Sequence, residues 1–238
     1  MSTLILRLAA PMQSWGDSSR FTVRQTRREP TKSGIIGLIA AAQGRRRSDS
    51  IEDLLNLKLA VRVDQPGTLL RDFHTARKAS GESMPLTYRY YLSDAVFVAA
   101  IEGERDVVEG IAESLRRPRH PLYLGRRSCP PSAPLVLKIV ELSALAALKS
   151  DEVPWQAADW FRKRCEKTGY AADLVFDLSD ESQGDPTVMT DVVQDCPVTF
   201  DQRHREYTWR NVGRSQVVLR ERAEKLTTHD PMSVMEGK

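Results

Sequence analysis

Short apolar runs alternate along the chain with polar segments, and the spacing within each run predicts a secondary structure. Leu4, Leu6 and Leu8 are two positions apart, which predicts a first β-strand over residues 3–8 with one apolar face. Residues 95–101 are almost wholly apolar, which predicts a central strand buried on both faces. At least one well-covered sheet is therefore expected.

Two segments have the apolar spacing of amphipathic helices. The first begins at Ser33, a residue type favoured as an N-cap, and stops before Gly44, which favours a left-handed end. The second covers residues 104–115. Weaker patterns predict short helices over residues 51–57 and 155–167, and strands over residues 59–63, 135–142, 172–178, 188–193 and 207–219.

Residues 70–91 have the pattern of a long hairpin. The centre is polar and contains Gly81, while the flanks are rich in Thr, Tyr and Phe, which suits strands. Period-two alternation puts Tyr88 and Tyr90 on one face, and Arg89 and Tyr91 on the other. Such an arm can slide between the bases of a single strand, or it can be an ordinary two-stranded arm with half-buried tyrosines.

The order of these elements predicts an α+β protein. Strand, helix, strand, strand, helix and strand follow one another within residues 1–145, the βαββαβ order of a ferredoxin-like domain of the kind that RNA-recognition modules use. The aromatic signatures of those modules are absent. We expect a smaller, β-rich region over residues 146–238, with a frayed tail over residues 230–238.

The composition narrows the class of protein. No apolar run approaches the ~20 residues of a membrane span, and the N-terminal apolar stretch lacks a basic leader, so neither a membrane protein nor a signal peptide is expected. The three cysteines and four histidines are scattered, which argues against disulfides and a metal site. We expect a cytoplasmic protein with no cofactor.

The charge is unevenly distributed. Residues 168–202 contain eight acids and no Lys or Arg, so the rest of a chain with net charge +3 carries +11. A basic body favours nucleic acid through counterion release. The acidic segment would repel a phosphate backbone, so we expect it to face solvent or a protein partner.

Residues 116–131 form the most informative segment, since five arginines, a histidine, a tyrosine and a glycine lie within it. Arginine forks match phosphate oxygens, so Arg119, Arg126 and Arg127 are predicted to neutralise phosphates. Tyr123 offers a ring for base stacking, and Gly125 lets backbone approach a ligand. A solvated loop whose arginines pair with acids is the alternative.

Further RNA-binding candidates lie elsewhere. Lys32, Ser33 and Gly34 stand at a helix start, where free N–H groups and the helix dipole attract phosphate. Trp15 is a second candidate for base stacking, and Tyr207 and Trp209 form another aromatic cluster with nearby arginines. The remaining candidates are Arg24 and Arg27 before the first helix, and His74, Arg77, Tyr88 and Arg89 in the hairpin.

Five motifs, in order, resemble one family. LILRLAAPMQSWG, PTKSGIIGLIAAAQG, LRDFHTA, YYLSDAVF and PRHPLYLGRRSCP are similar to the CasD family, the Cas-five-type RAMP subunits of Cascade, the type I-E CRISPR surveillance complex in antiviral defence. The resemblance covers residues 1–140 well. It implies a ferredoxin-like domain with a protruding thumb, matched by residues 70–91, a glycine-rich loop at residues 124–127 and a helix start at residues 32–34.

The resemblance also implies a role. Such a subunit caps the 5′ end of the CRISPR RNA (crRNA) by holding its repeat-derived handle, without catalytic residues. It contacts a CasC-type backbone subunit and the large subunit that recognises the PAM, and it meets target DNA within the assembled complex.

Two other functions remain open. A metal-independent endoribonuclease that processes precursor crRNA needs a base and a cation, and His74, His120, Lys78 and a tyrosine could supply them. A scaffold whose arginines meet acidic protein surfaces is the third interpretation.

Overall fold

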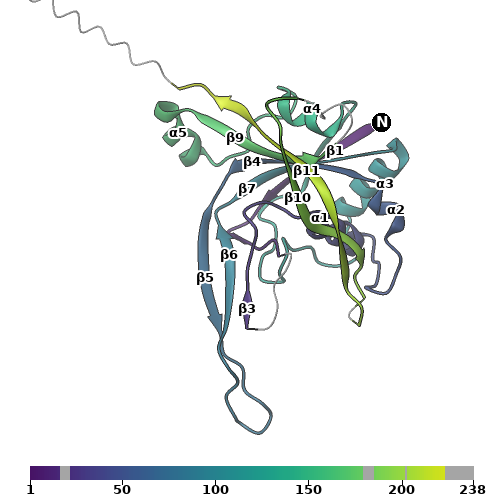
Figure 1. The fold of residues 1–238 in the computed structure, drawn as a ribbon, viewed down its shortest axis with the longest axis vertical. Helices are drawn as coiled ribbons and strands as arrows, with labels where there is room; N and C mark the ends of the chain where they lie inside the picture. Colours follow the sequence, from purple (N-terminus) through teal and green to yellow (C-terminus); the bar gives the residue numbers. More distant parts are fainter. Residues whose placement is uncertain (17–21, 179–184, 202, 223–238) are drawn as a thin grey trace, which may run out of the picture.

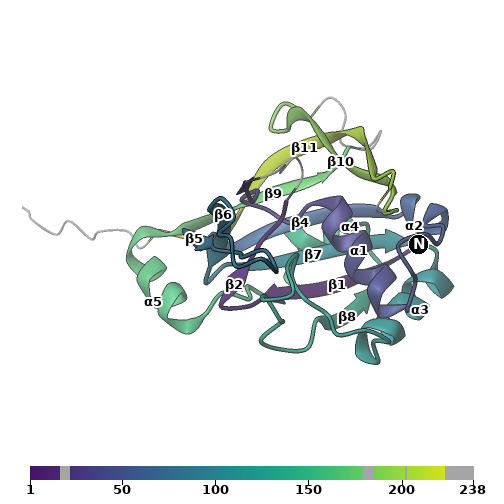
Figure 2. The ribbon, with the colours of Figure 1, turned by 90° about the horizontal axis from the view of Figure 1, so that it is seen from below.

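A seven-stranded sheet forms the body of the molecule. The computed structural model describes residues 1–16, 22–178, 185–201 and 203–222. The strand order is β10-β11-β9-β4-β7-β1-β8, and each paired neighbour is antiparallel (Figures 1 and 2). The strands are β1 (Ser2–Ala9), β4 (Lys58–Gln65), β7 (Val96–Gly103), β8 (Val136–Val140), β9 (Tyr170–Asp177), β10 (Met189–Thr199) and β11 (Glu206–Arg220).

Helices follow two of the strands in the order that the sequence predicts. Helix α1 (Lys32–Ala42) follows β1, and α3 (Arg105–Arg116) follows β7. The expected mixture of helices and strands is confirmed. The C-terminal strands continue the same sheet, because β9 pairs with β4. The division at residue 145 stays a prediction, and the predicted tail over residues 230–238 lies outside the described residues.

The sheet has a separate apolar layer on each face. Leu4, Leu6 and Leu8 pack in one cluster with the apolar residues of α1 and α3. Ile5 points to the other face, where it packs with α4 (Ala144–Lys149), a short helix that the sequence patterns missed. Both faces of β1 are therefore buried, which explains why its Leu–Ile run is almost wholly apolar.

The start of α1 differs from the sequence prediction. Thr31, not Ser33, is the N-cap, and its side chain accepts a hydrogen bond from the Gly34 amide. The predicted stop at Gly44 is confirmed by its left-handed φ of +79°. Shorter helices also occur near the predicted positions, namely α2 (Glu52–Leu55) and α5 (Asp159–Thr168). None of the described helices has the length and apolar character needed to cross a membrane.

A second, smaller sheet forms a projecting arm. Strands β5 (Thr68–His74) and β6 (Thr87–Ser93) form the arm, and β6 also pairs with β2 (Met12–Gln13) and β3 (Val23–Arg24). The arm extends well beyond the body (Figure 1). It continues β4 and β7, with bends at Gly67 (φ +70°) and Asp94 (φ +56°).

Candidate nucleic-acid interface

The loop after α3 is pressed against the chain that follows β2. Gly125 has a φ of +88°, and a Cβ there would lie 1.6 Å from the Ser14 carbonyl oxygen. The Ser14 amide donates to the Leu124 carbonyl at 3.1 Å, and the Leu124 amide donates to the Cys129 carbonyl at 2.7 Å. Burial raises the pKa of the Cys129 thiol. Only glycine fits this conformation and this contact, so Gly125 fixes the path of the loop.

Arg126 ties this loop to two strands of the small sheet. Its Nη1 donates to the Tyr90 carbonyl at 3.1 Å and its Nη2 to the Arg24 carbonyl at 3.0 Å. The guanidinium carbon lies 4.6 Å from the centre of the Tyr91 ring. Arg126 was expected to neutralise phosphate, but its donors are directed at protein carbonyls, so its visible role is to position the loop.

The other residues of the loop are more open. Arg119, His120 and Arg127 are exposed, and Tyr123 is half-buried. The methylene groups of Arg119 lie over the end of α1, because a Cβ at Gly44 would approach its Cδ to 2.8 Å. Neither Arg119 nor Arg127 forms an ion pair with an acid in the described part of the chain. Their charges are available to an anion.

Two further arginines meet at the base of the arm. Arg24 on β3 and Arg89 on β6 are direct partners in a parallel pair, and Asp72 on β5 is the partner of Arg89 on its other side. The Arg89 Nε is buried and has no hydrogen-bond partner among the described residues. The carboxylate oxygen Oδ2 of Asp72 lies 3.0 Å from Nε2 of His74. Two adjacent cations and an unsatisfied donor attract an anionic ligand.

We call Arg24, Arg89, Arg126 and Arg127 the arginine surface. The contacts of Arg126 place the loop beside β3 and β6, so cations far apart in the sequence are brought together. The sequence predicted all four residues, but nothing in the sequence showed that they converge or that Arg126 holds the others in place.

Strand alternation places Tyr88 on the opposite face of the arm from Arg89, as predicted. On that face the guanidinium of Arg71 lies 5.3 Å from the centre of the Tyr88 ring, and Phe73 is the direct cross-strand partner of Tyr88. Phe73 is 62% exposed. Arg71 and Phe73 were not candidates in the sequence, although the alternation in LLRDFHT places them with Tyr88. Arg77 lies further out, in the exposed tip.

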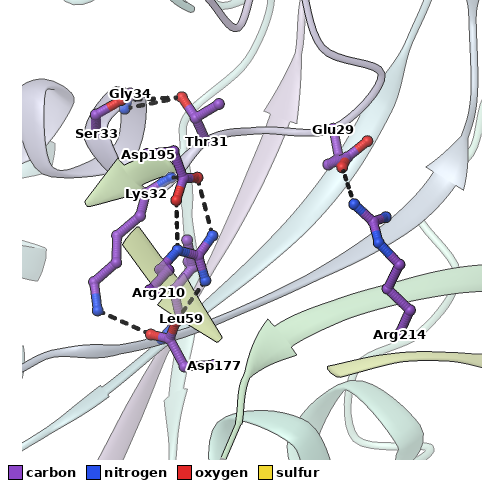
Figure 3. Close-up of polar contacts among 10 residues, drawn as sticks. All are labelled: Glu29, Thr31, Lys32, Ser33, Gly34, Leu59, Asp177, Asp195, Arg210 and Arg214. Atoms are coloured by element: carbon purple, nitrogen blue, oxygen red, sulfur yellow. Dashed lines mark hydrogen bonds and ion pairs between the residues drawn. The ribbon is translucent and has the colours of Figure 1, made fainter. Parts of the chain in front are cut away.

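The helix start that was expected to bind phosphate has carboxylate partners instead (Figure 3). The Lys32 amide donates to Asp195 Oδ2 at 2.8 Å, and the Lys32 ammonium donates to Asp177 Oδ2 at 2.9 Å. Lys32 and Ser33 are buried. A Cβ at Gly34 would lie 2.7 Å from the ring of Trp15. A phosphate at this helix end would have to displace a buried carboxylate, which argues against the predicted contact.

The prediction that Trp15 stacks on a base is wrong. Its side chain is 1% exposed, and its indole N–H donates to Gln13 Oε1 at 3.2 Å. Arg27, another candidate, lies close to it, since the Arg27 amide donates to the Trp15 carbonyl at 2.7 Å. The Arg27 side chain is half-buried.

The acidic segment turns inward where it meets the second aromatic cluster. Arg210 donates from Nε to Asp195 Oδ1 at 2.6 Å and pairs with Asp177 Oδ1 at 2.5 Å (Figure 3). Burial disfavours the charge of Arg210, but these two carboxylates outweigh burial and raise its pKa. The expectation that the segment faces solvent or a partner is wrong for these two acids, which neutralise cations within the fold.

Side chains alternate between the two faces of β11, and this alternation separates members of the predicted cluster of Tyr207, Trp209 and nearby arginines. Trp209 is 62% exposed, whereas Arg210 points to the opposite face. Arg214 is paired with Glu29 at 2.9 Å and with Asp191 at 3.1 Å. Arg210 and Arg214 are therefore not available to extend an RNA surface around Trp209.

Comparison with known proteins places these features in a family. A model described as CRISPR-associated protein (Cas_Cas5) matches residues 3–213. The CRISPR system Cascade subunit CasD of Escherichia coli (strain K12) is 38% identical over 163 residues, which cover 60% of this chain and 73% of the relative.

Solved structures agree with this assignment. One, described as a CRISPR RNA-guided surveillance complex, contains a chain that is 34% identical with a TM-score of 0.74, and the match covers 92% of this chain and 91% of that one. Another, described as a crystal structure of a Cas protein, is 34% identical with a TM-score of 0.67 and coverage of 92% and 95%. The matched region includes β1, the arm, the loop after α3 and most of β11, and on this evidence the chain belongs to the CRISPR-associated Cas5 family.

Proposed function

We propose that this chain is a non-catalytic, RNA-binding subunit of a Cascade complex that caps and holds the 5′ handle of the crRNA. The observation that carries the proposal is the arginine surface, where the loop after α3, β3 and β6 bring four cations together. Membership of the Cas5 family supports it, because the E. coli relative is a Cascade subunit.

The roles differ within this surface. Arg24, Arg89 and Arg127 bind handle phosphates, and the buried Nε of Arg89 gains the partner that it lacks here. Arg126 and Gly125 position the loop. Tyr123 stacks with a splayed base, an interaction worth roughly 1–3 kcal/mol per base. Arg119 extends the positive surface toward the end of α1.

The fold supports the same proposal. The strand order β4-β7-β1-β8, with α1 and α3 packed in one apolar cluster, is that expected of a ferredoxin-like RAMP domain. The arm formed by β5 and β6 acts as the thumb, and it separates the first guide base from its neighbours. His74, Arg77 and Tyr88 lie along the arm and would contact RNA there.

The proposal includes the assembly in which the subunit works. A CasC-type backbone subunit and the large PAM-recognising subunit are the proposed protein partners, with target DNA contacted in the assembled complex in the cytoplasm. No cofactor takes part. The described residues include no group of three or more His, Cys, Asp or Glu side chains that could hold a metal ion.

An endoribonuclease is the second candidate, and one observation favours it. His74 Nε2 lies 3.0 Å from Asp72 Oδ2, a pairing that can orient a general base. Both side chains are nearly half exposed, and they lie on a projecting arm rather than in an enclosed site. The geometry thus provides binding surfaces more clearly than a catalytic centre.

The test is RNA binding in EDTA across a salt series, with handle RNA and an RNA of equal length and scrambled sequence. Loss of one phosphate contact from single-stranded RNA lowers the salt slope by about 0.7. We therefore expect Arg127→Ala and Arg89→Ala each to weaken handle binding and reduce this slope. Arg105→Ala, at an exposed, paired arginine on α3, is the matched control.

Two results would oppose the proposal. Equal slopes for the Arg127→Ala, Arg89→Ala and Arg105→Ala variants would show that the arginine surface does not bind the handle. Site-specific cleavage in EDTA that disappears in His74→Ala would identify the chain as a processing nuclease.

A further inference from the structure

Helix α5 has an outer face with one aromatic and three cationic side chains. The contacts described above do not explain this composition. Trp160, Lys163, Arg164 and Lys167 follow the spacing i, i+3, i+4 and i+7, so they lie along one side of the helix. All four are exposed, and the indole of Trp160 is 54% exposed. The face thus combines one exposed aromatic ring with three cationic side chains. The helix lies beside β9 at one end of the sheet, away from the arm tip (Figures 1 and 2).

The three cations on this face are not neutralised by acids of the described chain. The helix has two acids, and each is paired with a cation outside the face. Asp159 pairs with Arg162 at 2.6 Å, and Glu166 pairs with Arg220 at 3.8 Å. Lys163, Arg164 and Lys167 thus present a concentrated positive charge to solvent.

Arg164 and Trp160 are already arranged for a planar ligand. The guanidinium carbon of Arg164 lies 5.5 Å from the centre of the Trp160 ring and 4.9 Å from that of Phe161. These cation–π contacts hold the guanidinium against the rings, and its N–H groups have no hydrogen-bond partner in the described residues. An indole beside a fixed guanidinium is typical of surfaces that stack bases and bind phosphates.

The helix is firmly attached to the body, so the face is preorganised. Phe161 packs edge-on against Tyr170 at 5.2 Å between ring centres, and Tyr170 stacks on Trp155 at 5.4 Å. The Tyr170 hydroxyl donates to the Val63 carbonyl at 2.7 Å, and the Trp155 indole donates to the Asp64 carbonyl at 2.8 Å. Both acceptors lie at the end of β4. A ligand would therefore order little beyond the side chains that it touches.

We propose that this face of α5 is a second nucleic-acid site, which binds a single strand through its phosphates and one stacked base. Lys163, Arg164 and Lys167 contact phosphates, and Trp160 stacks on the base. Charge complementarity favours a nucleic-acid strand over a protein, because a protein interface rich in unpaired lysine is disfavoured. The site is separate from the arginine surface and does not rest on the proposed binding of the handle.

The test measures binding of the full chain to labelled single strands that lack the handle sequence, with DNA, RNA and duplex DNA as separate arms. The triple variant Lys163→Ala, Arg164→Ala, Lys167→Ala should weaken single-strand binding and lower the salt slope by about 2. Trp160→Ala should weaken it by roughly 5- to 150-fold without a change of slope. The control, Arg105→Ala, Lys138→Ala, Lys58→Ala, removes three charges elsewhere, each of which is paired with an acid.

The outcomes separate this site from the handle site. Arg127→Ala should change binding of handle RNA and leave single-strand DNA binding by α5 intact. In the assembled complex, lower DNA binding in the α5 variants would identify DNA as the ligand, whereas reduced retention of crRNA would identify RNA. Equal effects of the α5 triple variant and the control would overturn the proposal. The proposal would also be overturned if the α5 variants bound nucleic acid normally but did not assemble into the complex. That result would indicate an acidic protein partner.

Discussion

Asp195→Ala removes the centre of the buried ionic cluster that joins α1 to the C-terminal strands. Asp195 is 3% exposed and accepts hydrogen bonds from the Lys32 amide and from Nε and Nη2 of Arg210. Without this carboxylate, the Lys32 amide loses its acceptor, and the largely buried guanidinium of Arg210 keeps Asp177 as its remaining carboxylate partner. The variant leaves the Lys32 amide buried without an acceptor, and the buried Arg210 charge with one carboxylate in place of two.

The expected cost follows from the burial. Removal of one partner from a buried ion pair typically destabilises a protein by about 3–5 kcal/mol, since the remaining charge stays desolvated. In a chain of this length, 1 kcal/mol lowers the midpoint of thermal unfolding by roughly 2–4 °C, so we expect a drop of about 6–20 °C. Asp195→Asn keeps the shape and one acceptor, and should cost less.

Asp191→Ala is the matched control, because Asp191 also lies on β10 and pairs with an arginine of β11. Its side chain is 49% exposed, and its bond to Arg214 is 3.1 Å long. An exposed pair contributes about 0–1 kcal/mol. Unfolding in urea and on heating should show that Asp195→Ala is much less stable than Asp191→Ala. If the two variants lose equal stability, the cluster does not hold the C-terminal strands against α1, and the reasoning from burial is wrong.

Gly125, Cys129 and Asp53 each lie in surroundings that a single substitution or reagent can test. Gly125→Ala should lower stability and handle binding far more than Gly81→Ala. Both glycines have left-handed φ angles, +88° and +87°, but only at Gly125 would an added Cβ meet backbone atoms. Equal melting curves for the two variants would contradict this prediction. Cys129 is buried with a raised pKa, so its thiol should react slowly with an alkylating reagent at pH 7 until denaturant is added, as mass spectrometry will show. The hydrogen bond from Arg45 lowers the pKa of Asp53 in the folded chain. This carboxylate should therefore stabilise the fold by under about 1 kcal/mol at pH values above its unfolded pKa of ~3.9. The stabilisation should be lost as the pH falls. The difference in unfolding free energy between Asp53→Ala and the parent chain should therefore shrink as the pH falls below ~3.9, and a difference that grew there would refute the sign.

The elements with strong periodicity were predictable, because local patterns determine them. The alternation of Leu4, Leu6 and Leu8 predicted β1, and the apolar spacing in residues 104–115 predicted α3. The N-cap of α1 was placed two residues too late because Thr31 and Ser33 are both good caps, and the choice depends on tertiary contacts. Helix α4 was missed because six residues give too little periodicity.

The candidate site was predictable in its residue types but not in their roles. An arginine that binds carbonyls, as Arg126 does, has the same sequence signature as one that binds phosphate. Lys32 appeared available because its partners, Asp177 and Asp195, lie more than a hundred residues away. The burial of Trp15 depends in the same way on side chains that only the fold brings together.

The direction of the arm and its length depend on different parts of the chain: the two bends set the direction, and the tip sets the length. The two bends are tightly packed, since a Cβ at Gly67 would lie 2.5 Å from the Ser93 carbonyl oxygen, and the side chain of Gln65 donates to the Asp94 carbonyl. The tip, in contrast, closes on itself, as Met84 donates to Ala76 and no atom lies within 4 Å of the Cβ position at Gly81. Pairs of residues added symmetrically near the tip would lengthen the arm by about 3.3 Å per pair without moving the body. Evolution can thus adjust the reach of the arm by insertion or deletion, whereas a change at either bend would re-aim it.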